Sequence, residues 1–300
     1  MIYTVTLNPS LDYIVKLGKL NIGEVNRSEE EQIFPGGKGI NVSLVLSKLD
    51  EMSRCLGFVA GFTGNEIVHR LENEGCETDF VILPKGFSRI NVKLKCEEES
   101  EINSGGPKIE IKELEVLFSK LEDLKDDDIL VLAGSIPSSV PPDIYERWIK
   151  RLYNKKLKIV IDASGEALRR VLPLHPFLVK PNHHELGELI GKRLTSTEEI
   201  IESAISLQKM GARNVLISRA ADGAILLDEK GKIYIANAPE GKVVNSVGAG
   251  DSMVAGFLAG YQKYGSYNEA LKLGIAAGSA SAFSQWLGSS DMIWDIYKTL

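Results

Sequence analysis

The sequence predicts an α/β protein in which helices cover both faces of a parallel sheet. Continuous apolar runs such as Ile129 to Ala133 and Asn214 to Ser218 are typical of strands that are buried on both faces. Segments with helical spacing of apolar residues separate these runs, as in a parallel sheet. Two stretches in the first third, about 11–35 and 88–105, contain alternating strands without helices between them. These stretches indicate a second, smaller sheet with one solvated face.

The first third of the chain combines both kinds of strand. The expected strands are Ile2 to Leu7, Leu11 to Leu17, Ser28 to Phe34, Cys55 to Ala60, Val81 to Leu83 and Ile90 to Lys95. Helices are expected at Ile40 to Leu49 and Glu66 to Glu74. The acidic run Glu97 to Glu101 follows the last of these strands, and we expect it at a solvated hairpin tip.

After Pro107 the alternation of strand and helix becomes more regular. The expected strands are Ile129 to Ala133, Lys158 to Ile161, Phe177 to Val179, Asn214 to Ser218 and a hairpin of Ala224 to Leu227 with Lys232 to Ile235. The expected helices are Ile111 to Leu121, Asp143 to Tyr153, Asn182 to Ile190 and Glu198 to Met210, and the chain is expected to end in two more, about Gly250 to Tyr264 and Asn268 to Gln285.

Composition limits the function classes. The chain has 300 residues and a net charge of −6, which argues against broad nucleic-acid binding because that requires a basic surface. The three cysteines, Cys55, Cys76 and Cys96, form no C-x-x-C pair, so neither a disulfide framework nor a zinc site is expected. The N-terminal residues lack a signal-peptide pattern, and no apolar run is long enough to span a membrane. We therefore expect a cytoplasmic protein.

Several common catalytic motifs are absent. The run Gly36-Gly37-Lys38-Gly39 lacks the Ser or Thr that follows the lysine of a Walker A loop. No G-x-G-x-x-G follows the first strand, and no G-x-S-x-G occurs anywhere. His184-Glu185 begins an H-E-x-x-H pattern, but residue 188 is Glu, which excludes a zinc-protease helix.

The strongest local motif is the run from Asn245 to Ser252, whose small residues begin a helix. The free N–H groups of a helix N-terminus attract anions, and Gly248 and Gly250 would let a phosphate approach the backbone. Asp251 would lie beside that anion and could serve as a general base for an attacking hydroxyl. On local grounds, Asp251 could equally be a simple helix cap.

Polar residues near other predicted turns could hold further parts of a ligand. The glycines of Pro35 to Asn41 permit close backbone approach, and Lys38 and Asn41 could bind polar groups, although a tight turn before a helix would look the same. Asp12 could hold sugar hydroxyls or could be a surface turn residue. Arg89 and Arg27 are candidate cations for a phosphate, although most lone arginines are solvated.

The run Lys180 to Glu185 places Asn182 and Glu185 three residues apart at a predicted helix start. Both residues would face the carboxyl end of the parallel sheet, where α/β proteins bind ligands. Their oxygen atoms suit a hydrated Mg²⁺ ion. The same spacing is also that of a capping box, with Asn182 at the N-cap and Glu185 at N3.

In combination, these motifs resemble the ribokinase-like (PfkB) carbohydrate kinases, and the resemblance covers essentially the whole chain. The motifs occur in the order and spacing of that family: Asn8 to Asp12, Gly36 to Asn41, Gly134 to Pro137, Lys180 to Glu185 and Val247 to Ser252. The resemblance implies a single domain over 1–300, built as a three-layer α/β/α sandwich with a central, mostly parallel sheet. It also implies a small β-sheet lid formed by the insertions about 11–35 and 88–105.

The resemblance also implies site roles. Asp251 would be the catalytic base, and the N–H groups of Gly248, Ala249 and Gly250 would form the anion hole. The residues implied for the acceptor sugar phosphate are Asp12, Gly36, Gly37, Lys38, Asn41, Arg89, Ser135 and Arg27. The residues implied for ATP are Lys180, Asn182, Glu185, Ser218, Asp222, Gly223, Ser246, Gly248 and Gly250. Glu185 would act on Mg²⁺ through water. Ala220 stands where the family commonly has Gly. The nucleotide contacts around this residue are therefore expected to depart from those common in the family.

Within the family, the chain resembles the kinases that phosphorylate fructose 1-phosphate at its C6 hydroxyl. The alternatives are a tagatose-6-phosphate kinase or a 6-phosphofructokinase, and, from another class, a non-catalytic sugar-phosphate sensor. A nucleoside kinase is disfavoured because its substrate carries no phosphate for Arg89 to meet. The resemblance implies ATP and Mg²⁺ as cofactors and a homodimer formed through the lid, with no membrane or nucleic-acid partner.

Overall fold

The first strand of the chain lies in the interior of the main sheet. In the computed structural model, which describes residues 1–300, β1 (Ile2–Thr6) pairs in parallel with β4 (Ser53–Ala60) and with β9 (Ile129–Ala133). The other strands of this sheet are β5 (Glu77–Thr78), β6 (Val81–Leu83), β10 (Lys158–Asp162), β11 (Leu178–Val179), β12 (Asn214–Ser218), β13 (Ala224–Leu227) and β14 (Ile233–Ala236). Its order is β14-β13-β12-β11-β10-β9-β1-β4-β5, with β6 beside β4. Only β13 and β14 run antiparallel to their neighbours, so the sheet is mostly parallel.

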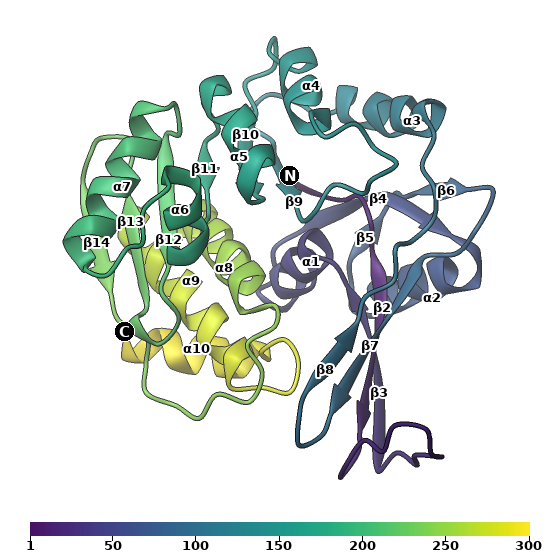
Figure 1. The fold of residues 1–300 in the computed structure, drawn as a ribbon. Coiled ribbons are helices and arrows are strands. Elements are labelled where there is room, and N and C mark those ends of the chain that lie inside the picture. The colour runs from purple at the N-terminus through teal and green to yellow at the C-terminus, as the bar shows by residue number, and fades with distance from the viewer.

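Helices cover both faces of this sheet (Figure 1). One face carries α3 (Ile111–Glu122), α4 (Ile144–Arg151), α5 (Gly165–Val171), α6 (His183–Ile190) and α7 (Thr197–Lys209). The other carries α1 (Lys38–Lys48), α2 (Gly61–Asn73), α8 (Ala249–Tyr264), α9 (Tyr267–Ala282) and α10 (Ser290–Thr299). Successive residues of β9 enter opposite cores, Leu130 and Leu132 on the first face and Ile129 and Val131 on the second. The predicted α/β class is confirmed.

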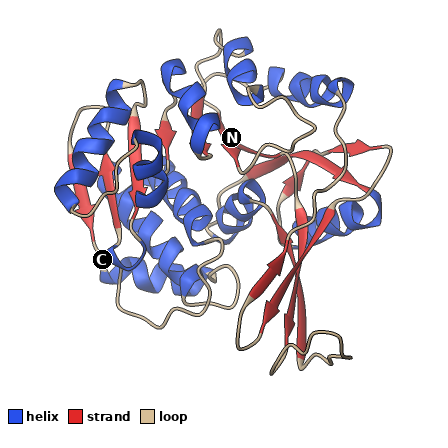
Figure 2. Cartoon of the chain, in the orientation of Figure 1, coloured by secondary structure: helices blue, strands red, loops and turns tan.

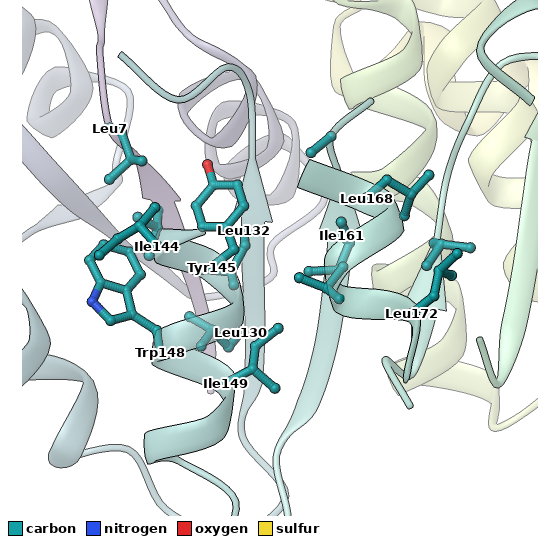
Figure 3. Close-up of a cluster of buried hydrophobic side chains, with 14 of the residues drawn as sticks. Leu7, Leu130, Leu132, Ile144, Tyr145, Trp148, Ile149, Ile161, Leu168 and Leu172 are labelled. Atoms are coloured by element: carbon teal, nitrogen blue, oxygen red, sulfur yellow. The ribbon is translucent and has the colours of Figure 1, made fainter. Parts of the chain in front are cut away.

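The core on the first face is closed by α4. Figure 3 shows Tyr145, Trp148 and Ile149 of this helix against Leu130 and Leu132 of β9. Tyr145 and Trp148 are among the largest fully buried side chains of the molecule. At the upper end of this packing, the Tyr145 hydroxyl lies 3.4 Å from the Ala133 carbonyl at the end of β9. This packing fixes the carboxyl end of β9, next to the site described below.

A second sheet stands apart from the α/β body (Figure 2). Its strands, in spatial order, are β3 (Glu30–Gly36), β2 (Ser10–Lys16), β7 (Arg89–Lys95) and β8 (Ser100–Ile102). The pair β2 and β7 is parallel, whereas β3 and β8 are antiparallel to their neighbours. A stack of Phe34 on Trp286, with ring centroids 4.5 Å apart, joins β3 to the loop after α9.

Four helices and strands lie outside the sequence prediction. The helix α5 and the strands β5 and β8 were not predicted. The chain also ends in three helices rather than two, because Ser289 caps a further helix, α10, with its side chain. Helix α9 also ends at Ala282, earlier than predicted. Each missed segment is short, and tertiary packing rather than a long apolar period defines it. None of the helices is both long enough and apolar enough to cross a lipid bilayer.

Candidate active site

Two adjoining cavities open at the carboxyl ends of the parallel strands, where α/β folds usually bind ligands. We call the first the polar cavity; its volume is about 820 Å³, and its lining includes Asp12, Arg89 and Asp251. The second, the adjacent cavity, measures about 730 Å³ and is lined between α6 and α8 by more apolar residues. Both cavities share Asn182, Ser218 and Gly250 as lining residues, so two ligands could meet at the start of α8.

The first turn of α8 lies at this junction. Gly248, the N-cap of α8, has a φ of 80°, which a side chain disfavours, and an added Cβ would lie 2.9 Å from Leu287. A small residue is therefore required where the free N–H groups of the helix point into the cavities. Asp251, in the first turn, is only 6% exposed, and its Oδ2 accepts a 2.8 Å hydrogen bond from Asn41 Nδ2.

Burial determines the charge state of Asp251. Loss of solvent, together with the nearby charge of Asp162, raises the pKa of Asp251 to about 7. The ammonium groups of Lys38 and Lys180 and the bond from Asn41 act in the opposite direction. A carboxylate with a pKa near neutrality is well suited to take a proton from a hydroxyl, so this geometry fits a general base.

Asp162 is a buried carboxylate that the sequence analysis missed. It lies at the end of β10, is 1% exposed and accepts a 2.9 Å bond from Lys38 Nζ, while Lys180 Nζ lies 3.4 Å away. Burial would raise the pKa of Asp162, but the two ammonium groups hold it below its ordinary value. Burial alone would lower the pKa of Lys38. The nearby carboxylates have the larger effect, and the pKa of Lys38 is raised. A polar residue directly after the apolar run Ile159 to Ile161 was the available signal.

The far end of the polar cavity is formed by the second sheet. Asp12 on β2 accepts bonds from Ser10 Oγ at 2.8 Å and from Asn91 Nδ2 at 3.0 Å. Arg89, at the start of β7, is half-buried, and its Nε donates to the Asn8 carbonyl at 3.0 Å. Burial lowers the pKa of Arg89, whereas the Asp12 charge raises it. This end therefore offers both a carboxylate acceptor and a guanidinium donor to a ligand.

The Asn182 and Glu185 pair forms a complete capping box. The Glu185 N–H donates to Asn182 Oδ1, and the Asn182 N–H donates to Glu185 Oε2, both at 2.8 Å. The capping interpretation of these residues is thus correct, yet it uses only one oxygen of the Glu185 carboxylate. Both residues line the polar cavity. The remaining oxygen leaves this carboxylate able to hold a hydrated Mg²⁺ ion.

The comparisons with known proteins decide the family. The description "pfkB family carbohydrate kinase" matches residues 6–292 of the chain. The chain belongs to the pfkB family of carbohydrate kinases. It is 49% identical to a 1-phosphofructokinase of Bacillus subtilis, with 98% of this chain and 96% of the relative covered. It is 41% identical to a D-tagatose-1-phosphate kinase of Bacillus licheniformis, with 96% and 94% covered.

A solved structure agrees with this family. Phosphofructokinase-2 from Escherichia coli, crystallised in complex with substrates and products, matches with a TM-score of 0.94 and 30% identity. The match covers 100% of this chain and 99% of that one. The predicted membership of the ribokinase-like (PfkB) kinases is therefore confirmed, and the chain is a sugar kinase by family and by fold.

The kinase fold brings most of the predicted site residues together. The polar cavity is lined by Asp12, Gly37, Lys38, Asn41, Arg89, Ser135, Lys180, Asn182, Glu185, Ser218, Gly248, Gly250 and Asp251. The adjacent cavity adds Gly223, Ser246 and Ala249. Gly36 lies behind Asp12 rather than on the cavity wall. Arg27, in the loop after β2, and Asp222, in the turn before β13, are exposed and line neither cavity. Their roles as ligand contacts remain predictions.

Proposed function

We propose that this pfkB kinase transfers the γ-phosphoryl group of ATP to the C6 hydroxyl of fructose 1-phosphate, giving fructose 1,6-bisphosphate. The observation that carries the proposal is the position of Asp251. This buried carboxylate lines the polar cavity in the first turn of α8, next to Gly250, which lines both cavities. The choice of acceptor is supported by the 1-phosphofructokinase with 49% identity over almost the whole chain.

Asp251 would act as the general base. As the acceptor hydroxyl attacks the γ-phosphorus, Asp251 takes its proton and the bond to the ADP oxygen breaks. The N–H groups of Gly248, Ala249 and Gly250 would donate to the oxygens of the transferring group. The Asn41 side chain holds one Asp251 oxygen at 2.8 Å and would leave the other free to face the hydroxyl.

The polar cavity would hold the sugar phosphate. Asp12, Gly37 and Asn41 would meet the sugar hydroxyls, and the guanidinium of Arg89 would meet the C1 phosphate. Ser135 lines the same cavity, and Lys38 lies close to Asp251. A phosphate held at the end of the second sheet would point the opposite end of the sugar, C6, toward Asp251.

The adjacent cavity would hold the nucleotide. Its apolar lining suits a base, and Ser218, Gly223 and Ser246 would contact the nucleoside. Lys180, close to the first turn of α8, would lie along the phosphates; an added Cβ at Gly250 would be 3.3 Å from its Nζ. When bound, Mg²⁺ supplies positive charge that offsets the charge of the phosphates. Glu185 would hold that ion through water, with the one carboxylate oxygen that its capping box leaves free.

A second acceptor follows from a specific observation. The D-tagatose-1-phosphate kinase that is 41% identical to this chain is named for a sugar that also carries its phosphate on C1. Fructose and tagatose differ only in the configuration of one hydroxyl, so the same phosphate contact would serve both. Tagatose 1-phosphate is therefore the second candidate acceptor, ahead of any sugar 6-phosphate.

The test is a coupled ADP-release assay with Mg-ATP and four acceptors. These are fructose 1-phosphate, tagatose 1-phosphate, fructose 6-phosphate and tagatose 6-phosphate. We expect kcat/KM for fructose 1-phosphate to exceed the values for both 6-phosphates by at least about tenfold. A preference for a 6-phosphate would reverse the sugar in the cavity and contradict the proposal, and no turnover at all would favour a non-catalytic sensor.

We also propose that the second sheet is a lid that contributes to a homodimer interface. Its strands and loops expose apolar side chains to solvent, among them Ile22, Val25 and Ile102. Such exposed apolar groups are typical of surfaces that pair with a partner. Light scattering on purified protein tests this assembly: twice the 32.9 kDa mass is expected, and a monomer would contradict it.

A further inference from the structure

The second sheet places a row of three polar side chains opposite Asp12. Arg89, Asn91 and Lys93 alternate along β7 and therefore lie on the same face of the strand. The register of the parallel pair sets Asp12 of β2 opposite Asn91, with Arg89 and Lys93 one step to either side. Asp12 thus lies diagonally between two cations, of which the sequence analysis noted only Arg89.

Asp12 is paired with only one of these two cations. The Lys93 ammonium lies 3.1 Å from Asp12 Oδ2, and Lys93 has no other carboxylate within ion-pair distance. Lys93 is 9% exposed, so water screens this pair weakly. The other Asp12 oxygen accepts from Ser10 and Asn91. The carboxylate is therefore held on both sides.

Arg89 is left without a carboxylate partner. Its only hydrogen bond within the chain runs from Nε to the Asn8 carbonyl, while the guanidinium carries five N–H donors in total. Asp12 is near enough for its charge to act on Arg89, but the Lys93 ammonium neutralises that charge. The acceptor end of the polar cavity consequently keeps one positive charge that the fold itself does not use.

We propose that Lys93 is a positioning residue for the acceptor: it neutralises and orients Asp12, and so keeps Arg89 free for the phosphate of the sugar phosphate. Lys93 does not line the polar cavity, whereas Asp12, Asn91 and Arg89 do. It therefore acts through Asp12 and does not touch the ligand. The proposal rests on the proposed function for the identity of that ligand.

The two cations of β7 therefore have different roles: Lys93 pairs with Asp12, and Arg89 stays available for the phosphate of the ligand. Without Lys93, Asp12 would be a half-buried carboxylate whose charge still acts on Arg89. An ion pair between those two would then form at the expense of the substrate. The enzyme would then lose affinity for the phosphate of the acceptor. Affinity for ATP would not change, because no residue of the second sheet lines the adjacent cavity.

The test compares Lys93→Met with the matched control Lys95→Met. Lys95 lies two residues further along the same strand face and pairs with the exposed Glu99, away from Asp12. Lys93→Met should raise the Kd for fructose 1-phosphate, measured by calorimetry, and its KM by at least about tenfold. The kcat and the KM for ATP should stay within about twofold. The lost contact would bind the acceptor equally in the ground state and in the transition state, so its loss raises KM without lowering kcat. Lys95→Met should leave all four values unchanged.

A double variant separates positioning from direct contact. If Lys93 acts by keeping Arg89 free, Lys93→Met should add no more than about threefold in Kd to a chain that already carries Arg89→Met. Full additivity would mean that Lys93 itself contacts the phosphate, and would overturn the proposal. An unchanged Kd in the single variant would overturn it too.

Two further measurements keep the result interpretable. If Lys93→Met does not fold, Lys93→Gln replaces it, since its amide can still donate to Asp12 without the charge; the same rise in Kd is expected. Calorimetry without ATP also separates this inference from the proposed function. A wild-type chain that binds fructose 1-phosphate but does not phosphorylate it would contradict the function alone, whereas a chain that does not bind it would contradict both.

Discussion

The α/β body and the second sheet contribute to the site in different ways. The body supplies Asp251, the first turn of α8 and the buried group of Asp162, Lys38 and Lys180, all anchored on two apolar cores. The second sheet supplies Asp12 and Arg89 from strands that are largely half-buried or exposed. The groups proposed for phosphoryl transfer thus lie on the part with two apolar cores, and the groups that would select the sugar lie on a thin sheet with little core of its own.

This difference predicts that changes in the body will lower kcat and that changes in the second sheet will raise KM for the sugar. The largest effect is expected for Asp251→Asn, in which the base is lost while shape is kept. The kcat should fall by about 10²- to 10⁴-fold, with little change in the KM for fructose 1-phosphate. Steady-state kinetics check this; a kcat near the wild-type value would exclude Asp251 as the base.

Thermal unfolding provides the control for that variant. Because the pKa of Asp251 is raised to about 7 in the fold, its ionised form destabilises the native state as pH rises from about 4 to 7, and the cost stays constant above that range. Asp251→Asn removes this cost. The variant should therefore melt no lower than the wild type at pH 8, so that its loss of turnover cannot be attributed to unfolding.

The next largest effect is expected in the second sheet, for Gly36→Ala. An added Cβ at Gly36 would lie 2.7 Å from Ser10 Oγ and 2.8 Å from Asp12 Cγ, so the Asp12 carboxylate must move. The KM for the sugar phosphate should rise about tenfold or more, with the KM for ATP unchanged. Gly105→Ala is the matched control, because an added Cβ there meets no atom within 4 Å. Equal kinetics for the two variants would remove the argument for Asp12.

A graded effect is expected from pH, within about tenfold for the first pH unit below neutrality. Asp251 can accept a proton only as a carboxylate, and its pKa is about 7 in the free enzyme. The kcat/KM should therefore fall about tenfold for each pH unit below 7 and should level off above it. A pH series at constant ionic strength measures this. A flat profile between pH 5 and 8 would contradict a base of that pKa.

The smallest effect is expected for the residue of the α/β body that lowers the pKa of Asp251. The bond from Asn41 to Asp251 lowers the pKa of that carboxyl. Asn41→Ala should therefore shift the midpoint of the pH profile upward, by about half a unit to one unit. Ser43→Ala is the control in the same helix, since Ser43 bonds to Thr4 away from the site. An upward shift in both variants would point to a general change in the helix.

The sequence predicts the long, regular helices and strands, but not the short segments whose structure depends on tertiary packing. Apolar runs and helical periods predicted most of the main sheet, and the motif from Val247 to Ser252 predicted the start of α8 to within a residue. The final helix, α10, was missed because its pattern is short and Ile293 is its only fully buried residue. A helix this short is stabilised mainly by packing against its neighbours, so its sequence periodicity alone does not predict it.

The candidate site shows the same limit. Asp12, Arg89 and Asp251 could be selected from motifs, but Asp162 and Lys93 belong to no motif and acquire meaning only from the partners that the fold brings to them. Arg27 illustrates the opposite case, because a plausible cation in the sequence lies in an exposed loop outside the polar cavity. Charge patterns identify candidates, and burial and pairing decide among them.

The hydrogen bond between Asn41 and Asp251 has a consequence for biosynthesis. It joins residues that are 210 positions apart. The interior strand β1 likewise has both edges paired only after β9 has been synthesised. Contacts of such sequence separation form slowly. Synthesis from the N-terminus therefore produces the second sheet early, and the first turn of α8 with Asp251 much later. The polar cavity is therefore complete only after α8 has been synthesised.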